Sequence, residues 1–261
     1  MIMKVKILSK KGEKLSFLLE DSTPAFANAL RRVIMTEVPV LAVEWVDIHD
    51  NNSILFDEMI ASRLGLIPLK FDPSKFSKPD ECKCGGKGCP LCQVVLALEK
   101  TGPGTAYSGD LKSSNKDVKP TSPAFPIVDL LKNQGVRLEA IARLGTGKQH
   151  AKFQAANAAY QYYPEAITHD IEKAKKALKP CPADVMEAKG TKVTINDPAR
   201  YETCMRYADL SEGGFEIKCD PTRFIFNVES ISGLDPGYIV TKAAEILEGK
   251  AEGFMKELSK V

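Results

Sequence analysis

Four cysteines that fall within eleven residues constrain this chain more than any other feature of its sequence. They have the spacing Cys82-x-Cys84-x4-Cys89-x2-Cys92, in a Lys-, Pro- and Gly-rich segment, 71–92, that cannot form a regular helix or strand. Two closely spaced pairs of thiolates can wrap a short loop around one tetrahedral ion, and the intervening glycines supply the turns. We therefore expect a structural zinc site, with two disulfides or free thiols as the alternatives.

The other three cysteines, Cys181, Cys204 and Cys219, are scattered. Cys181-Pro182 matches the last two residues of the bacterial ferredoxin motif C-x2-C-x2-C-x3-C-P, whose cysteines bind a four-iron cluster. The three preceding ligand positions of that run are occupied by Ile171, Ala174 and Ala177. We therefore expect no four-iron cluster. A three-iron cluster, one disulfide and burial as small apolar side chains stay open for the three thiols, and the cluster is the least favoured.

Charge and hydropathy narrow the class of protein further. The 261 residues include 36 Lys and Arg against 34 Asp and Glu, which leaves a net charge of +2. Proteins whose main function is to bind phosphate groups usually carry a larger excess of basic residues. The nearly equal numbers of basic and acidic residues therefore favour a protein partner or a small ligand. The longest apolar stretches, such as 94–98, are far too short to span a membrane. Because the N-terminus also lacks the apolar core of a secretory signal, we expect a cytoplasmic protein.

Periodicity predicts a mixture of helices and antiparallel strands, the α+β class. Residues 3–20 read as a hairpin that turns at Lys10-Lys11-Gly12. A short helix is expected where Phe56, Ile60 and Leu64 are spaced by four, and a long one from Asp235-Pro236 to about Lys260. Further strands are expected at 40–48, 93–100, 136–144, near Val193, at 215–219 and at 223–232, with further helices after 164 and at 200–207.

Residues 24–36 predict an amphipathic helix with Thr23 as N-cap and Pro24 at its first position. At about 100° per residue, one broad face is apolar and the opposite face is compact and basic. The apolar face carries Phe26, Ala27, Ala29, Leu30, Val33 and Ile34. The opposite face carries Asn28, Arg31 and Arg32.

Catalytic motifs are not evident. The loop Gly145–His150 contains Gly147-Lys148, but Gln149 follows where a phosphate-binding P-loop needs Ser or Thr, so we read it as a connecting loop. The three histidines are isolated from any nucleophile or zinc-protease pattern. We therefore expect no catalytic residue in this chain.

Three blocks of sequence, taken together, resemble the alpha family of multisubunit RNA polymerases, and in particular its archaeal D subunits. These subunits are related to the third-largest subunit of eukaryotic polymerase II and to the bacterial alpha N-terminal domain. The first block lies in the helix, at 26–33, and the second is 56–68. The third combines Arg137-Leu138-Glu139-Ala140 with Gly145-x-Gly-Lys-Gln-His150-Ala-Lys152. The blocks follow the family's order, and the resemblance spans nearly the whole chain.

The resemblance implies a domain plan. Residues 1–42 and 222–261 form a discontinuous dimerisation domain, and residues 43–221 form an inserted, mainly β domain. The insert includes a cysteine loop at 80–93, where the eukaryotic relative carries a zinc loop, and a ferredoxin-like subdomain at 164–220.

The resemblance also implies a role. The chain is expected to be a non-catalytic assembly subunit of a DNA-directed RNA polymerase, a nucleotidyltransferase. It pairs with subunit L, then contacts the two large subunits and the small subunits N and P, and meets DNA only through the complex. The expected subunit interface includes Phe26, Asn28, Leu30, Arg31, Arg32 and Val33.

Two other classes stay as rivals. A zinc-dependent nucleic-acid-binding module would explain the cysteine loop, although the near-neutral charge argues against it. An electron carrier built on residues 164–220 would need an iron–sulfur cluster there.

Overall fold

The computed structural model describes residues 3–260, so Met1 and Ile2 of the predicted N-terminal segment lie outside the described residues, as does Val261. The chain divides into two compact units. The first contains Met1–Lys11, Leu15–Ala29 and Ala159–Asn227, and the second contains Gly12–Lys14, Leu30–Ala158 and Val228–Val261. The predicted domain bounds, 1–42 with 222–261 and 43–221, stay a prediction. In the described part of the chain, every helix is too short or too polar to cross a membrane.

A four-stranded sheet with the order β1-β2-β14-β11 supplies the core of the first unit. Phe17 of β2 stacks on Phe226 of β14 with ring centroids 4.9 Å apart, while every residue of the edge strand β1 is exposed. The predicted hairpin is confirmed, with its turn at Gly12 in the left-handed region (φ +54°). The strands are β1 (Lys4–Lys11), β2 (Lys14–Glu20), β11 (Ala156–Thr168) and β14 (Phe215–Ser230).

Two sequence predictions fail in this sheet. The strands expected at 215–219 and 223–232 are one continuous strand, because the backbone stays extended through Asp220-Pro221. The long strand β11 is not predicted from the sequence at all. It contains Pro164, which is tolerated because β11 lies at the edge of the sheet.

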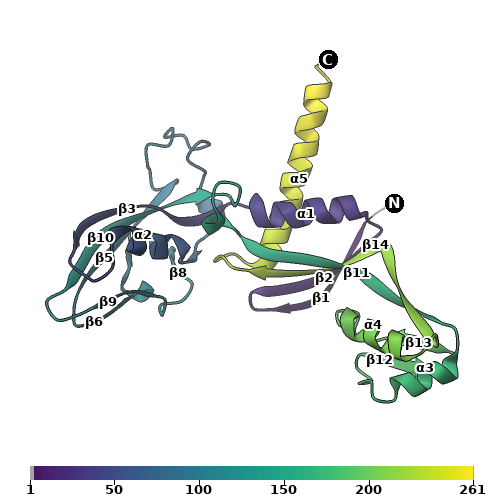
Figure 1. Cartoon of the computed structure of the whole chain (residues 1–261). Coiled ribbons are helices and arrows are strands. Elements are labelled where there is room, and N and C mark those ends of the chain that lie inside the picture. The colour runs from purple at the N-terminus through teal and green to yellow at the C-terminus, as the bar shows by residue number, and fades with distance from the viewer. Residues whose placement is uncertain (1–2, 261) are drawn as a thin grey trace. The chain divides into compact units, whose positions relative to one another are not determined.

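The chain between β11 and β14 forms a small subdomain of two helices and a two-stranded ribbon (Figure 1). It has a core of its own, in which Ala174 and Cys204 are fully buried. Ile171 packs against the same core, so two of the empty ferredoxin ligand positions carry apolar packing. The elements are α3 (Ile171–Leu178), β12 (Met186–Lys189), β13 (Lys192–Ile195) and α4 (Tyr201–Leu210).

An antiparallel sheet with the order β3-β10-β5-β7 forms the core of the second unit. The central strand β10 pairs Ala140 with Val46 of β3 on one side and with Leu96 of β5 on the other. The strands are β3 (Val40–Asn51), β5 (Gln93–Thr101), β7 (Lys112–Ser113) and β10 (Gly135–Gly145). Two short ribbons pair β4 (Leu69–Lys70) with β8 (Lys119–Pro120) and β6 (Gly104–Tyr107) with β9 (Pro126–Leu130).

The helix α2 (Asp57–Leu66) confirms the short helix predicted from the spacing of Phe56, Ile60 and Leu64, but it begins one residue after Phe56. Ile60 and Leu64 are fully buried, whereas Phe56 is 78% exposed. Phe56 precedes the helix with an extended backbone (φ −65°, ψ 154°), so it does not continue the buried face. Single 3-10 turns occur at η1 (Pro73–Lys75), η2 (Ser108–Asp110) and η3 (Ala151–Phe153).

The helices α1 (Pro24–Thr36) and α5 (Pro236–Leu258) begin where their capping residues predict. The hydroxyl of Thr23 accepts a hydrogen bond from the N–H of Phe26, and the carboxylate of Asp235 accepts from the N–H groups of Gly237 and Tyr238. The C-terminal part of α5 runs free of the other elements of its unit (Figure 1). Every residue from Glu248 to Lys260 is exposed. Among residues 3–260, the antiparallel strand pairs and the five α-helices agree with the predicted α+β class.

Candidate metal centre and assembly surface

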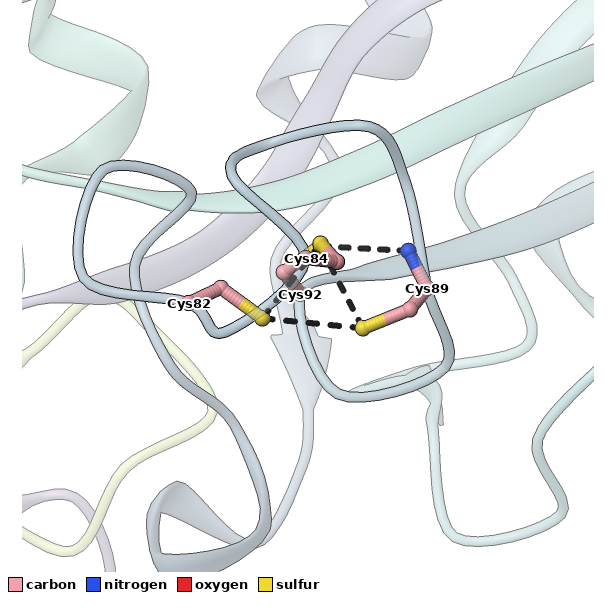
Figure 2. Close-up of side chains that lie close together, drawn as sticks. All are labelled: Cys82, Cys84, Cys89 and Cys92. Carbon is pink, nitrogen blue, oxygen red and sulfur yellow. Dashed lines mark hydrogen bonds between the residues drawn. The ribbon is translucent and has the colours of Figure 1, made fainter.

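The loop that precedes β5 brings four sulfur atoms together (Figure 2). The sulfurs of Cys82, Cys84, Cys89 and Cys92 all lie within 4.8 Å of one another. The Sγ–Sγ distance is 3.5 Å for Cys82–Cys84 and for Cys82–Cys89, 3.6 Å for Cys84–Cys92 and 3.8 Å for Cys89–Cys92. The backbone turns in the left-handed region at Gly85, Gly86 and Gly88. The structure therefore assembles the predicted ligand set into a cluster that can hold a metal ion.

A backbone contact favours negative charge on this cluster. Cys92 is fully buried and directly precedes the first residue of β5, so one ligand is anchored on the sheet. The N–H of Cys89 donates to Cys92 Sγ across 3.3 Å. A backbone donor aimed at sulfur stabilises the thiolate, which is the form that binds metal.

The four thiols do not ionise alike. Burial acts to raise the pKa of Cys84, but hydrogen bonds with the other three thiols outweigh it and lower that pKa to about 6. A backbone hydrogen bond from Cys84 acts to lower the pKa of Cys82, yet hydrogen bonds to the neighbouring thiols and burial raise it to about 12. Thiols in contact thus resist full ionisation among themselves, and a cation is what allows all of them to become thiolates.

The other three cysteines do not form one cluster. Cys204 is fully buried in the subdomain core, and the half-buried Cys181 packs against the same core. Cys219 is exposed, and all three are free thiols. Burial raises the pKa of Cys204 to about 11. Among residues 3–260, the loop cysteines form the one group of three or more Cys, His, Asp or Glu side chains that could share a metal ion.

The predicted interface residues of α1 fall into two groups. Leu30 and Val33 are each only 4% exposed within this chain, so they offer almost no surface to another one. Asn28 and Arg32 are exposed, and Phe26 and Arg31 are half-buried. The surface of α1 that a partner can reach is therefore its polar face with Phe26 at its margin.

A second helix face was not identified from the sequence. Phe254, Met255 and Leu258 of α5 are 67%, 68% and 57% exposed. With Leu247 and Ala251 they fall within about 100° of the helix circumference, so they form an apolar stripe. We call these five residues the α5 stripe. The i, i+4, i+7 spacing of Leu247, Ala251 and Phe254 is visible in the sequence. The spacing does not show whether other residues cover the stripe, and the described part of the chain leaves its C-terminal end exposed.

In sequence, the chain is similar to alpha-like subunits of multisubunit RNA polymerases. Residues 46–168 match the family model of the RNA polymerase Rpb3/RpoA insert domain. The chain is 36% identical over 263 residues to DNA-directed RNA polymerase subunit Rpo3 of Archaeoglobus fulgidus, with all of both chains covered. It is 37% identical over 256 residues to that of Methanothermobacter thermautotrophicus, covering 96% of this chain and 97% of the other. It is 38% identical over 259 residues to that of Pyrobaculum arsenaticum, covering 98% and 96%.

The chain belongs to the Rpo3 family of archaeal DNA-directed RNA polymerase subunits. The predicted function, a subunit of this polymerase, is confirmed, and its partners are other polymerase subunits. The matched insert segment, 46–168, lies inside the predicted insert of 43–221.

Proposed function

We propose that this chain is a D-type subunit of an archaeal polymerase, a non-catalytic component on which the enzyme assembles. It pairs with subunit L through the discontinuous dimerisation domain, 1–42 and 222–261. The pair then presents a surface to the two large subunits and to the small subunits N and P, and DNA is reached only through the complex. Its membership of the Rpo3 family supports this role.

The α5 stripe carries the proposal. An apolar stripe on an exposed helix end is not stable in water by itself, and such surfaces mark protein interfaces. The flanking residues Glu248, Glu252 and Lys256 are charged and lie off the stripe, which gives the helix one apolar side. A second helix of subunit L laid along this side would bury the stripe, and obligate interfaces of this kind bury about 2,000 Å² or more.

The polar face of α1 serves a different contact in this proposal. Arg31 and Arg32, beside Asn28, present guanidinium groups that make forked hydrogen bonds to carboxylates. We assign this face to a large subunit. Phe26, at its margin, belongs to the same interface.

The cysteine loop binds zinc in this proposal. A tetrahedron of sulfurs around zinc, with Zn–S distances of about 2.3 Å, has edges of about 3.8 Å. Four of the six Sγ–Sγ distances, 3.5 to 3.8 Å, fit those edges, and the other two lie within 4.8 Å. Because Cys82, Cys84, Cys89 and Cys92 fill all four positions, the ion has a structural role and no open site for a substrate.

Two aspartate substitutions on α5 test the pairing. Leu258→Asp places a charge in the stripe, and we expect it to abolish co-purification with subunit L. Lys256→Asp, two residues away and off the stripe, is the matched control and should pair like the parent. Both side chains are exposed, so circular dichroism should show folded protein in each case. Full retention of subunit L by Leu258→Asp would refute the assignment of the stripe.

The polar face of α1 is tested in a separate pull-down. The double change Arg31→Ala with Arg32→Ala should leave the pair with subunit L intact and impair its binding to a large subunit. Leu30→Asp is not a test of pairing, because Leu30 is buried in the chain's own core and the change would damage folding first. Assembly of complete polymerase by the double variant at the parental level would contradict the role of this face.

A further inference from the structure

The glycine-bearing loop Gly145–His150 packs against the C-terminal end of α1. The N–H of Lys148 donates to the carbonyl of Thr36 across 2.9 Å. A Cβ on Gly147 would lie 2.5 Å from the carbonyl oxygen of Met35 and 3.0 Å from Cα of Thr36. Since both neighbours are backbone, no side chain can give way, and only glycine allows this approach. The loop therefore satisfies a carbonyl that the helix end leaves open.

The first residue beyond α1 links three elements of the second unit. Glu37 Oε1 accepts from Lys148 Nζ at 3.1 Å and from Lys250 Nζ at 2.5 Å. Lys148 belongs to the glycine-bearing loop and Lys250 to α5. The side chain of Glu37 is only 16% exposed, against 63% for Lys148 and 49% for Lys250. One carboxylate thus joins the end of α1, the loop and the middle of α5.

The ion cluster differs from the other ion pairs of α5. Burial acts to raise the pKa of Glu37, but hydrogen bonds from Lys250 and Lys148 outweigh it and lower that pKa, so the carboxylate is ionised at neutral pH. By contrast, Lys242 and Glu245 form an exposed i, i+3 pair within the helix. Exposed pairs contribute little. Removing the partners of a half-buried carboxylate costs more, because it leaves a partly desolvated charge without compensation.

The position of Lys250 on the helix links this cluster to the α5 stripe. Lys250 follows Leu247 by three residues and precedes Phe254 by four, so it borders the stripe at about 40° to 60° around the helix axis. The buried Ile239 and Ala243 set the rotation of α5 near its start, and the contact between Lys250 and Glu37 holds the helix in that rotation seven residues beyond Ala243. The rotation of α5 decides in which direction the stripe faces.

We propose that Glu37 is a positioning residue for subunit pairing, which holds Lys250 so that the α5 stripe faces its partner. This inference rests on the proposed pairing of the chain with subunit L through α5. Glu37 contacts no partner itself in this scheme. The glycine-bearing loop supplies Lys148 to keep the carboxylate in place.

The test measures affinity for subunit L by titration calorimetry. We expect Glu37→Gln and Lys250→Met each to weaken binding about 10-fold, and the double variant to be no worse than either, because both remove one contact. Glu245→Gln is the matched control: it removes an ion pair of the same helix and should bind like the parent. Thermal unfolding of each variant monitors folding, and if Glu37→Gln does not fold, Lys250→Met, at a half-exposed lysine, carries the test.

Hydrogen exchange supplies a readout that lost stability alone would not give. Glu37→Gln should speed exchange at the end of α1 and in 145–150, while the amides of the sheet strand β10 before Gly145 keep their protection. Parental affinity in both single variants, or losses that add in the double variant, would overturn the inference. Failure of the parent chain itself to bind subunit L would instead overturn the proposed function.

Discussion

The cysteine loop and the α3–α4 subdomain both contain cysteines, but within residues 3–260 only the loop brings together enough of them to hold a metal ion. The four loop sulfurs lie within 4.8 Å of one another, whereas Cys181, Cys204 and Cys219 range from half-buried to fully buried to exposed. The subdomain has a core of eight buried residues, whereas the buried residues of the loop, 80–93, are Cys82 and Cys92, both of the ligand set. A short segment whose buried side chains are its ligands needs an ion to become ordered, and a segment with a core of its own does not.

The subdomain shows what replaces a cluster. Two positions of the ferredoxin ligand run hold Ile171 and Ala174, and both side chains pack in the core together with Phe215. Cys204 is part of the same core and lies in its fully buried part. Apolar contacts thus occupy the space in which that run would place metal ligands.

The largest effect is expected from removing a loop ligand. Cys89→Ser should release about one zinc per chain and disorder residues 80–93, because metal binding and folding are coupled in such loops. The β3–β10–β5 sheet should survive, since its contacts lie outside the loop. Metal analysis and hydrogen exchange measure the two outcomes. Cys219→Ser is the control and should keep the metal, and stoichiometric zinc in Cys89→Ser would contradict the assignment.

The second prediction concerns the subdomain core. Phe215 is 2% exposed, and Phe215→Ala should destabilise the subdomain by about 3–5 kcal/mol through lost burial and a cavity. Urea unfolding followed by circular dichroism measures this loss. The zinc content should stay unchanged. Loss of zinc together with the subdomain would show that the two regions are not independent.

Local signals explain what the sequence predicts well. Thr23-Pro24 and Asp235-Pro236 mark the starts of α1 and α5 because capping depends on neighbouring residues alone. The four-cysteine set is equally local, since spacing within eleven residues decides whether sulfurs can meet. Both features need no knowledge of distant parts of the chain.

Long-range packing explains what the sequence does not predict. Phe56 shares its spacing with Ile60 and Leu64, but spacing does not reveal that the chain is still extended at Phe56. The strand β11 is rich in Ala and begins after a 3-10 turn, so it lacks the β-branched alternation that marks a strand, and its pairing with β14 determines it. Likewise, the burial of Leu30 depends on neighbours that its helix pattern does not specify.

A third, smaller effect concerns the buried thiol of the subdomain. Cys204→Ser puts a hydroxyl in an apolar site and should cost about 1–3 kcal/mol, whereas Cys204→Ala should cost less. Burial raises the pKa of Cys204 from its ordinary value of 9.0 to about 11. The thiol therefore stabilises the fold fully below pH 9, and this contribution is lost as pH rises from 9 to 11.

Urea midpoints at about pH 8 and about pH 11 measure that contribution. The parent should lose more stability over this interval than Cys204→Ala, which has no thiol to ionise. An equal loss in both proteins would show that another group dominates the alkaline titration. It would also weaken the view that Cys204 acts as a buried apolar side chain.

The smallest effect on stability is expected from a change at Cys219. This change tests most directly whether the subdomain, unlike the cysteine loop, is held together without a metal. This thiol is exposed, and its sulfur lies 3.7 Å from the hydroxyl of Tyr201. Cys219→Ser should therefore change the stability of the subdomain by less than about 0.5 kcal/mol. If the subdomain is held by packing, anaerobically isolated parent and variant should both lack stoichiometric iron and labile sulfide. Iron and sulfide that are present in the parent and lost in Cys219→Ser would make this thiol a cluster ligand, and the subdomain would then depend on a metal as the loop does.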